Sequence, residues 1–336
     1  MVRKLRWLRT NNTWPYRNLA IEEYLTTHTA PGEVILFLWQ NHHTVVIGKN
    51  QDAWKECKVN ELEEGGGYLV RRLSGGGAVY HDAGNLNFTF CVQKPDYDVD
   101  RQLGVILRAL NALGIPAEKT GRNDITVGGR KVSGNAFYRS GPYCYHHGTL
   151  LVNVDPAKMG RYLNVDKRKL ASKGVDSVRA RVIGLSESKP ELTVDMLADA
   201  LLHAFSTEYG LEASQLDDAS LPTAEIDALT AKFKSWDFRL GRPIPFTYEM
   251  EDRFDWGGIA LQFSVKSGLI EHLTVRTDAM DDRLESALCQ ALTGKRYDAG
   301  VLTEAVANMA LATDITDEAA TQAIRQNLID LIKEKI

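Results

Sequence analysis

The sequence contains little cysteine, and its cysteines do not suggest disulfides or a metal site. The 336 residues include only four, Cys57, Cys91, Cys144 and Cys289, and no two of them form a CxxC pair. A chain of this length does not need a disulfide framework, and such wide spacing is not that of a zinc site. We therefore expect reduced thiols in a cytoplasmic protein, and we assign no metal ligand.

The chain also lacks an excess of positive charge and any long apolar run. Forty Lys and Arg against 44 Asp and Glu residues give a formal net charge of −4 at pH 7. This balance does not suit binding to a phosphate backbone, so we expect no nucleic-acid partner. No stretch reaches the roughly 18 apolar residues of a membrane span, and the basic N-terminus has no apolar core of a signal peptide. We expect a soluble protein that does not enter the membrane.

Hydrophobic periodicity indicates both helices and strands. Residues 15–28 and 99–113 carry apolar side chains at helical spacing. Residues 34–40 and 44–48 are short β-branched or aromatic runs on either side of a polar NHH, which is typical of two buried strands joined as a hairpin.

The order of these patterns predicts an α+β fold with two domains. Residues 1–245 would form a large domain with a mixed β-sheet flanked by helices. Residues 246–336 would form a small α+β domain, with two strands around Lys266–Gly268 and a closing helix.

The strongest local motif is RRLSGGGAVYHD, residues 71–82, in which three glycines lie between two predicted strands. Glycine lets the backbone approach a ligand closely, and its N–H groups can bind an anion. A flexible hairpin loop is the alternative, but the preceding arginines favour an anion site because guanidinium groups suit phosphate and carboxylate. No GxxxxGK[ST] motif occurs, so this is not a Walker A loop.

The segment GRNDITVGGRKVSGNAF, residues 121–137, places Lys131 on the return strand of a predicted hairpin. A lysine among alternating apolar residues is costly to bury unless a charge partner meets it. The pattern alone leaves two readings open, a surface lysine or a functional cation. In YHHGTLLVNV, the adjacent His146 and His147 would point to opposite faces of a strand and make a poor metal pair.

These three segments, in this order and spacing, resemble the lipoate-protein ligases, which are related to the lipoyl and octanoyl transferases and more distantly to the biotin ligases. The resemblance covers nearly the whole chain. It includes LFLWQNHHTVVIGKNQDAWKEC, LNVDKRKLASKGVDSVRARV and WGGIALQF.

The resemblance implies a two-step reaction. Lipoate and ATP would give lipoyl-AMP and pyrophosphate, and a lysine amine of an acceptor protein would then displace AMP. Mg²⁺ is expected with ATP because it neutralises phosphate charge. The implied partners are apo lipoyl domains, both those of 2-oxoacid dehydrogenase acyltransferase subunits and the glycine-cleavage H protein.

The resemblance also implies roles for single residues. Lys131 would contact the acyl carbonyl and the phosphate, and would supply catalytic positive charge. Asn123 and Asp124 would contact the adenylate, and residues 164–183 would order over the adenine. The nucleotide and acyl pocket would be lined by Arg72, Ser74, Gly75, Gly76, Gly77, Ala78, Val79, Tyr80, His81 and His147. For both histidines a structural role stays open.

Other functions fit parts of the same pattern. An acyltransferase of this fold would use an acyl carrier or a preformed adenylate and no ATP of its own. A covalent transferase needs a nucleophile, and Cys144, the only cysteine near the motifs, is more simply explained by packing. A non-catalytic lipoate carrier would release no pyrophosphate. The second domain favours the ligase, and the glycine-arginine loop of biotin ligases differs from RRLSGGG.

Overall fold

The computed structural model describes residues 1–120, 124–153, 155–164, 182–241, 247–311 and 318–336. The chain divides into two compact units. The first, here the N-terminal unit, contains residues 1–46, 56–71 and 79–239. The second, the C-terminal unit, contains residues 240–336 together with the earlier segments 47–55 and 72–78.

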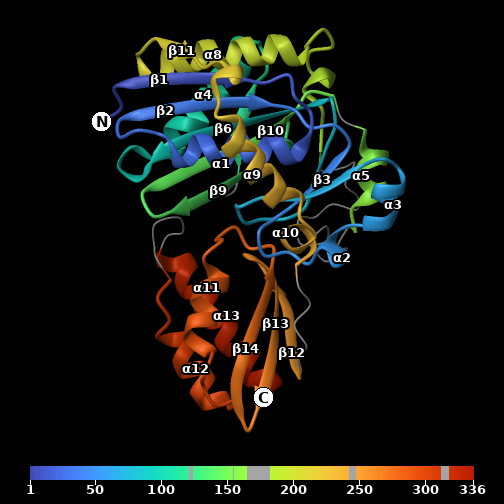
Figure 1. The fold of residues 1–336 in the computed structure, drawn as a ribbon, viewed down its shortest axis with the longest axis vertical. Coiled ribbons are helices and arrows are strands. Elements are labelled where there is room, and N and C mark those ends of the chain that lie inside the picture. The colour runs from blue at the N-terminus through green and yellow to red at the C-terminus, as the bar shows by residue number, and fades with distance from the viewer. Residues whose placement is uncertain (121–123, 154, 165–181, 242–246, 312–317) are drawn as a thin grey trace. The chain divides into compact units, whose positions relative to one another are not determined.

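The N-terminal unit is built on an eight-stranded mixed sheet (Figure 1). Its β1 pairs in parallel with β2 and β11, and the pairs from β2 through β6, β10, β9 and β8 to β7 are antiparallel. The strands, in spatial order, are β11 (Ala213–Gln215), β1 (Lys4–Arg9), β2 (Glu33–Trp39), β6 (Asn85–Gln93), β10 (Tyr143–Leu151), β9 (Arg130–Ser140), β8 (Asp124–Val127) and β7 (Ala117–Thr120).

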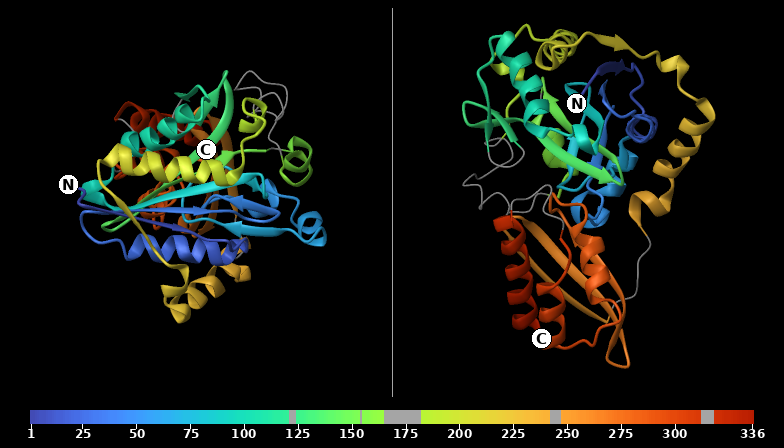
Figure 2. Two further views of the ribbon diagram at one scale, coloured as in Figure 1. Left: turned by 90° about the horizontal axis from the view of Figure 1, so that it is seen from above. Right: turned by 90° about the vertical axis from the view of Figure 1, so that its left-hand side faces the viewer.

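Helices cover both faces of this sheet. In Figure 2 (left), α4 and α8 lie on one side of it, and α1 and α9 lie on the other. The helices described in this unit are α1 (Pro15–Thr27), α3 (Val59–Glu64), α4 (Val99–Ala112), α5 (Pro156–Tyr162), α8 (Val194–Tyr209), α9 (Thr223–Lys234) and α10 (Trp236–Leu240), of which only the last residue falls in the C-terminal unit. The mixed sheet flanked by helices confirms the predicted fold class, and α1 and α4 confirm the two helices predicted from periodicity.

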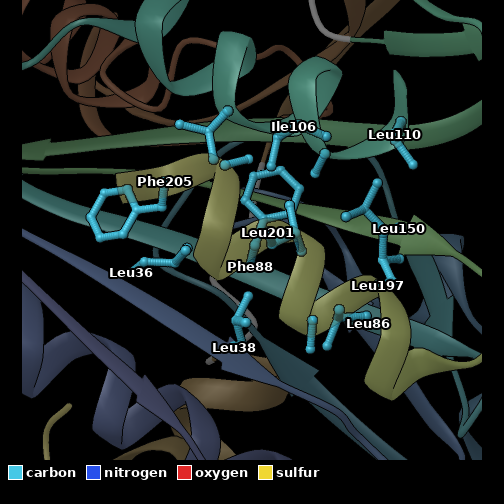
Figure 3. Close-up of a cluster of buried hydrophobic side chains, with 14 of the residues drawn as sticks. Leu36, Leu38, Leu86, Phe88, Ile106, Leu110, Leu150, Leu197, Leu201 and Phe205 are labelled. Atoms are coloured by element: carbon cyan, nitrogen blue, oxygen red, sulfur yellow. The ribbon is translucent and has the colours of Figure 1, made fainter. Parts of the chain in front are cut away.

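The face under α4 and α8 is the apolar core. Side chains from the sheet, such as Leu36 and Phe88, meet Ile106 of α4 and Leu201 and Phe205 of α8 (Figure 3). All five are at most 1% exposed. Burying such side chains contributes about 1.5–3 kcal/mol each, so this face stabilises the sheet that carries the site residues.

The predicted hairpin of residues 34–40 and 44–48 is wrong. Among the described residues, β2 pairs with β1 and β6 of the large sheet. Strand β3 (Thr44–Ile47) instead belongs to a three-stranded sheet with β4 (Tyr68–Arg71) and β5 (Val79–His81). The segment between β2 and β3 does not form a tight turn, because it is bonded to residues outside it. The Asn18 side chain donates to the Gln40 carbonyl, and the His42 amide donates to the Thr13 carbonyl.

The C-terminal unit has its own sheet and core. Its three antiparallel strands are β12 (Tyr248–Phe254), β13 (Gly257–Lys266) and β14 (Leu269–Thr277). Its helices are α11 (Leu284–Leu292), α12 (Ala299–Ala307) and α13 (Glu318–Lys335), and α2 (Ala53–Glu56) begins in the segment 47–55. The predicted turn at Lys266–Gly268 is confirmed, with positive φ at Ser267 and Gly268.

No helix among the described ranges is long and apolar enough to cross a membrane.

Candidate active site

Lys131 has a charge partner. Its Nζ lies 2.6 Å from Oδ1 of Asp124, and the two side chains are 22% and 19% exposed. The residues stand on adjacent strands, Asp124 at the start of β8 and Lys131 near the start of β9, and the hairpin between them turns at Gly128 and Gly129, both with positive φ. The pair supplies the carboxylate that a partly buried lysine needs.

His147 lies on the α1 face of the sheet. Its Nδ1 is 2.8 Å from Oε1 of Glu22, a buried residue of α1. The same oxygen accepts the hydroxyl of Thr89 at 2.6 Å, and that hydroxyl oxygen accepts the indole N–H of Trp39 at 3.1 Å. A connected set of buried polar groups therefore runs from β2 through β6 to β10 and α1.

His81 adjoins this network through Trp39. The two rings meet edge to face with centroids 6.3 Å apart, and Nδ1 of His81 lies 3.3 Å from the side-chain nitrogen Nδ2 of Asn41. On β5, Tyr80 precedes it and stacks on Tyr162 of α5 at 5.8 Å. Burial raises the pKa of Tyr80 to about 12, so its hydroxyl is protonated at neutral pH.

Sequence reasoning missed Glu22, Thr89, Asn85 and Asn87. The last three lie on one face of β6 and are at most 2% exposed, while Leu86 and its alternating neighbours enter the apolar core. The alternation in NLNFTF could have revealed a polar buried face. No comparable pattern marks Glu22, because an acidic residue on a helix is usually solvated.

The two adjacent histidines point to opposite faces, as predicted. His146 lies on the core face among Phe88, Phe90 and Phe137. It is fully buried, and burial lowers its pKa to about 3. Cys144, on the same strand, is also fully buried in the apolar core, which supports packing over a nucleophilic role.

The triple-glycine loop folds with the C-terminal unit. Residues 72–78 belong to that unit, and the Gly76 amide donates to the Ala279 carbonyl at 2.9 Å. A Cβ at Gly75 would come within 2.7 Å of that carbonyl and 2.8 Å of the Met280 carbonyl. The close approach of two backbones therefore requires glycine here, and an anion at the Gly76 amide would have to displace the Ala279 carbonyl.

The arginines before the loop have different partners. Arg72 is 5% exposed and donates to Ser74 Oγ at 3.0 Å and to the carbonyls of Gly75 and Gly77 at 2.7 and 2.8 Å, which fixes the shape of the loop. Arg71 donates to the carbonyls of Phe238 and Arg239 at the end of α10. Arg71 is therefore a helix cap.

Some predicted residues have no described geometry. Asn123 and most of the segment 164–183, namely residues 165–181, lie outside the described residues. Ala78 and Val79 are partly exposed and stand at the boundary of the two units, with Val79 pairing with Val46. The convergence of Lys131 and the glycine loop on one ligand stays a prediction, since the two belong to different units.

Comparisons with known proteins agree in both parts of the chain. Residues 14–206 match the family model of the lipoyl protein ligase A/B catalytic domain, and residues 244–332 match that of the bacterial lipoate protein ligase C-terminus. A lipoate-protein ligase A from Psychrobacter cryohalolentis is 42% identical over 303 residues, which cover 88% of this chain and 89% of the relative.

Solved structures show the same fold. LipL1 of P. falciparum, in complex with lipoate, has a TM-score of 0.83 and 28% identity, and covers 97% of this chain and 99% of its own. A lipoate-protein ligase A bound with ATP has a TM-score of 0.59 and 24% identity, and covers 72% of this chain and 99% of its own, a likeness of fold alone. The catalytic-domain match over more than half of the chain and the 42% identity to a curated ligase show that this protein belongs to the lipoate-protein ligase family.

Proposed function

We propose that this protein is an ATP-dependent lipoate-protein ligase. It activates the carboxylate of lipoate as lipoyl-AMP with release of pyrophosphate, and then transfers the lipoyl group to the ε-amine of a lysine on an acceptor protein. The observation that carries the proposal is the match of one chain to both the catalytic and the C-terminal models of the family.

The chemistry requires a cation at the reacting carboxylate. A carboxylate is a poor electrophile because of its negative charge, and joining it to the α-phosphate of ATP turns AMP into a leaving group. Lys131 is our candidate for the group that offsets charge on the acyl and phosphate oxygens in the transition state. Its ion pair with Asp124 keeps the ammonium compensated before substrates bind.

We assign the remaining sites by the same reasoning. Asn123 and Asp124 would contact the adenylate, and the loop at Arg72–Ala78 would contact the nucleotide. Val79 and Tyr80 would line the pocket. His81 and His147 would form walls of the acyl site, held by Asn41 and Glu22 respectively.

Mg²⁺ is proposed to enter with ATP. Among the described residues, no group of three or more His, Cys, Asp or Glu side chains could hold a metal ion. We propose that the ion is bound mainly by nucleotide phosphates and water, which is how Mg²⁺ commonly binds with ATP. Magnesium neutralises phosphate charge there, and we assign it no protein ligand.

The acceptors that fit this activity are apo lipoyl domains, namely those of 2-oxoacid dehydrogenase acyltransferase subunits and the glycine-cleavage H protein. We propose that the enzyme meets these acceptors in the cytoplasm. The reduced state of its four cysteines is consistent with that compartment.

The test incubates the purified protein with ATP, Mg²⁺, lipoate and an apo lipoyl domain, and measures pyrophosphate and the mass of the acceptor. We expect pyrophosphate and lipoylated acceptor in equal amounts. Acylation from synthetic lipoyl-AMP but not from ATP and lipoate would identify an adenylate-using transferase. Lipoate binding without either product would identify a carrier.

A matched pair of variants connects the activity to the site. Lys131→Ala should lower the rate of pyrophosphate release at least 100-fold, about 2.7 kcal/mol of transition-state stabilisation. Lys119→Ala, on β7 of the same sheet, removes a lysine that is 42% exposed and paired with Asp100, and should leave the rate within twofold of wild type.

A further inference from the structure

A β-bulge decides which way Lys131 points. Between β8 and β9, Asp124 pairs with Gly134 and Ile125 with Ser133, but Thr126 pairs with Lys131, so Val132 is an extra residue. An extra residue in one strand reverses the alternation of its side chains beyond that point.

The bulge places Lys131 on the face of the sheet that carries Asp124. Paired residues of an antiparallel ladder share a face, and so do residues two apart in a regular strand. Lys131 shares a face with Thr126, Thr126 with Asp124, and Asp124 with Gly134. In an unbroken strand, Lys131 and Gly134 would point in opposite directions.

The same register joins this face to the buried polar network. Gly134 and Ala136 lie two apart on β9, and Ala136 pairs with His147 of β10. The face that receives the Lys131 side chain is therefore the one on which His147 meets Glu22. Without the bulge, the Lys131 side chain would be directed toward the apolar core.

Gly134 supplies the space that the ammonium group occupies. A Cβ at position 134 would lie 2.8 Å from Nζ and 3.0 Å from Cε of Lys131, and the next atom, Oγ1 of Thr149, is 4.0 Å away. The atoms that a methyl group would displace are therefore the end of one flexible side chain. By contrast, a Cβ at Gly148 would meet the Phe88 ring at 2.6 Å and the Gly134 carbonyl at 2.7 Å, so that glycine is required by the core.

We propose that Gly134 and Asp124 are positioning residues for Lys131. The bulge at Val132 turns the lysine to this face, Gly134 leaves room for its ammonium group across the strand, and Asp124 holds it there by charge. This inference rests on the proposed function, because it names the residues that position the ammonium group used in the adenylation step.

The physical reason is preorganisation. A charge fixed in place before the reaction stabilises the transition state without a cost of reorganisation at that moment. A displacement of about 1 Å can lower a rate by about 10²-fold. The position of the Lys131 ammonium group therefore affects the rate of the chemical step more than the affinity for substrates.

The experiment compares Gly134→Ala with Gly160→Ala. Gly160 lies in α5 with no atom within 4 Å of its added Cβ, so it is a matched control. For Gly134→Ala we expect kcat for lipoyl-AMP formation to fall 10- to 100-fold, with the KM values of ATP and lipoate within twofold and the Tm within about 2 °C of wild type. Gly160→Ala should retain wild-type values.

A readout independent of activity follows Lys131 itself. In protein labelled with ¹³C-lysine, the Cε signal of Lys131, assigned by its loss in Lys131→Arg, should move in Gly134→Ala and in Asp124→Asn but not in Gly160→Ala. An unchanged signal in Gly134→Ala, or a kcat within twofold of that of Gly160→Ala, would overturn the proposal. If the wild-type enzyme released no pyrophosphate from ATP and lipoate, the proposed function would be refuted instead. The Cε signal would still test whether Gly134 and Asp124 position the Lys131 side chain.

Discussion

Glu22 and His147 form a buried acid–imidazole pair that joins α1 to the central sheet. Oε1 of Glu22 lies 2.8 Å from Nδ1 of His147, and the side chains are 2% and 10% exposed. The same carboxylate oxygen accepts the Thr89 hydroxyl. One side chain of α1 therefore satisfies donors on two neighbouring strands, β6 and β10.

Removing that carboxylate should destabilise the N-terminal unit. Glu22→Ala leaves the buried His147 and Thr89 donors without their acceptor, and we expect a loss of about 3 kcal/mol in the free energy of unfolding. Glu225→Ala, which removes a carboxylate that is 48% exposed and paired with His28, should cost less than about 1 kcal/mol. Urea unfolding measures both. Equal losses of unfolding free energy in the two variants would show that the buried pair stabilises the protein no more than an exposed pair does.

Nucleotide binding should change hydrogen exchange in two segments together. The Gly76 amide is bonded to the Ala279 carbonyl, so it must leave that carbonyl before it can bind a phosphate oxygen. We expect ATP to alter hydrogen exchange in peptides covering residues 72–78. We also expect faster exchange in residues 277–282, because the Ala279 carbonyl loses its bond to the Gly76 amide. Peptides of α13 serve as the control. A change confined to residues 72–78 would mean that the Gly76 amide keeps its present partner.

His146 should make the fold sensitive to acid. Burial lowers its pKa from 6.5 to about 3, so below pH 6.5 the unfolded chain takes up a proton that the folded protein does not. This group alone then lowers the free energy of unfolding by up to about 1.4 kcal/mol per pH unit as the pH falls from 6 to 4. His146→Gln should have a shallower pH dependence, whereas His272→Gln, an exposed position on β14, should match wild type. Parallel curves for all three proteins would contradict the assignment.

Asp282 should act in the opposite sense. Burial, as the largest cause, raises its pKa to about 6, with Lys49 opposing that shift and Asp281 adding to it. The folded state therefore favours the protonated carboxyl. The contribution of Asp282 to the free energy of unfolding is present at low pH and is lost as the pH rises from about 4 through 6. Asp282→Asn should raise the free energy of unfolding by about 2–3 kcal/mol at pH 7.5 and leave it nearly unchanged at pH 4.

Denaturant unfolding at the two pH values tests this expectation, with Asp252→Asn as the control because Asp252 is exposed on β12. A gain for Asp282→Asn that is equal at both pH values would attribute the effect to packing rather than to titration.

Much of the fold follows from local sequence, because the relevant signals are periodic. The helices α1 and α4 and the hairpin at Gly128 and Gly129 match the predicted positions. The pairing of β2 was not predictable in the same way. Its partners are set by strands far along the chain and by the Asn18 side chain, which anchors the connection after it.

The residue types of the candidate site were more predictable from the sequence than their arrangement. The resemblance to the lipoate-protein ligases points to Lys131, but the direction of its side chain depends on the register shift at Val132, which appears only when β8 and β9 are paired. The glycine loop was likewise visible, while its attachment to Ala279 involves a contact more than 200 residues away in sequence. Glu22, on α1, carries no local signal, since its partner His147 is on β10, more than 100 residues along the chain.

The proposed mechanism requires Lys131 and the triple-glycine loop to bind the same acyl phosphate. A crystal structure with a non-hydrolysable lipoyl-AMP analogue measures this most directly. We predict that Nζ of Lys131 and at least one amide of Gly75–Gly77 lie within about 3 Å of oxygen atoms of the same acyl-phosphate group. If the analogue instead binds with the ammonium and the glycine amides facing different ligand groups or different cavities, the proposed mechanism is contradicted.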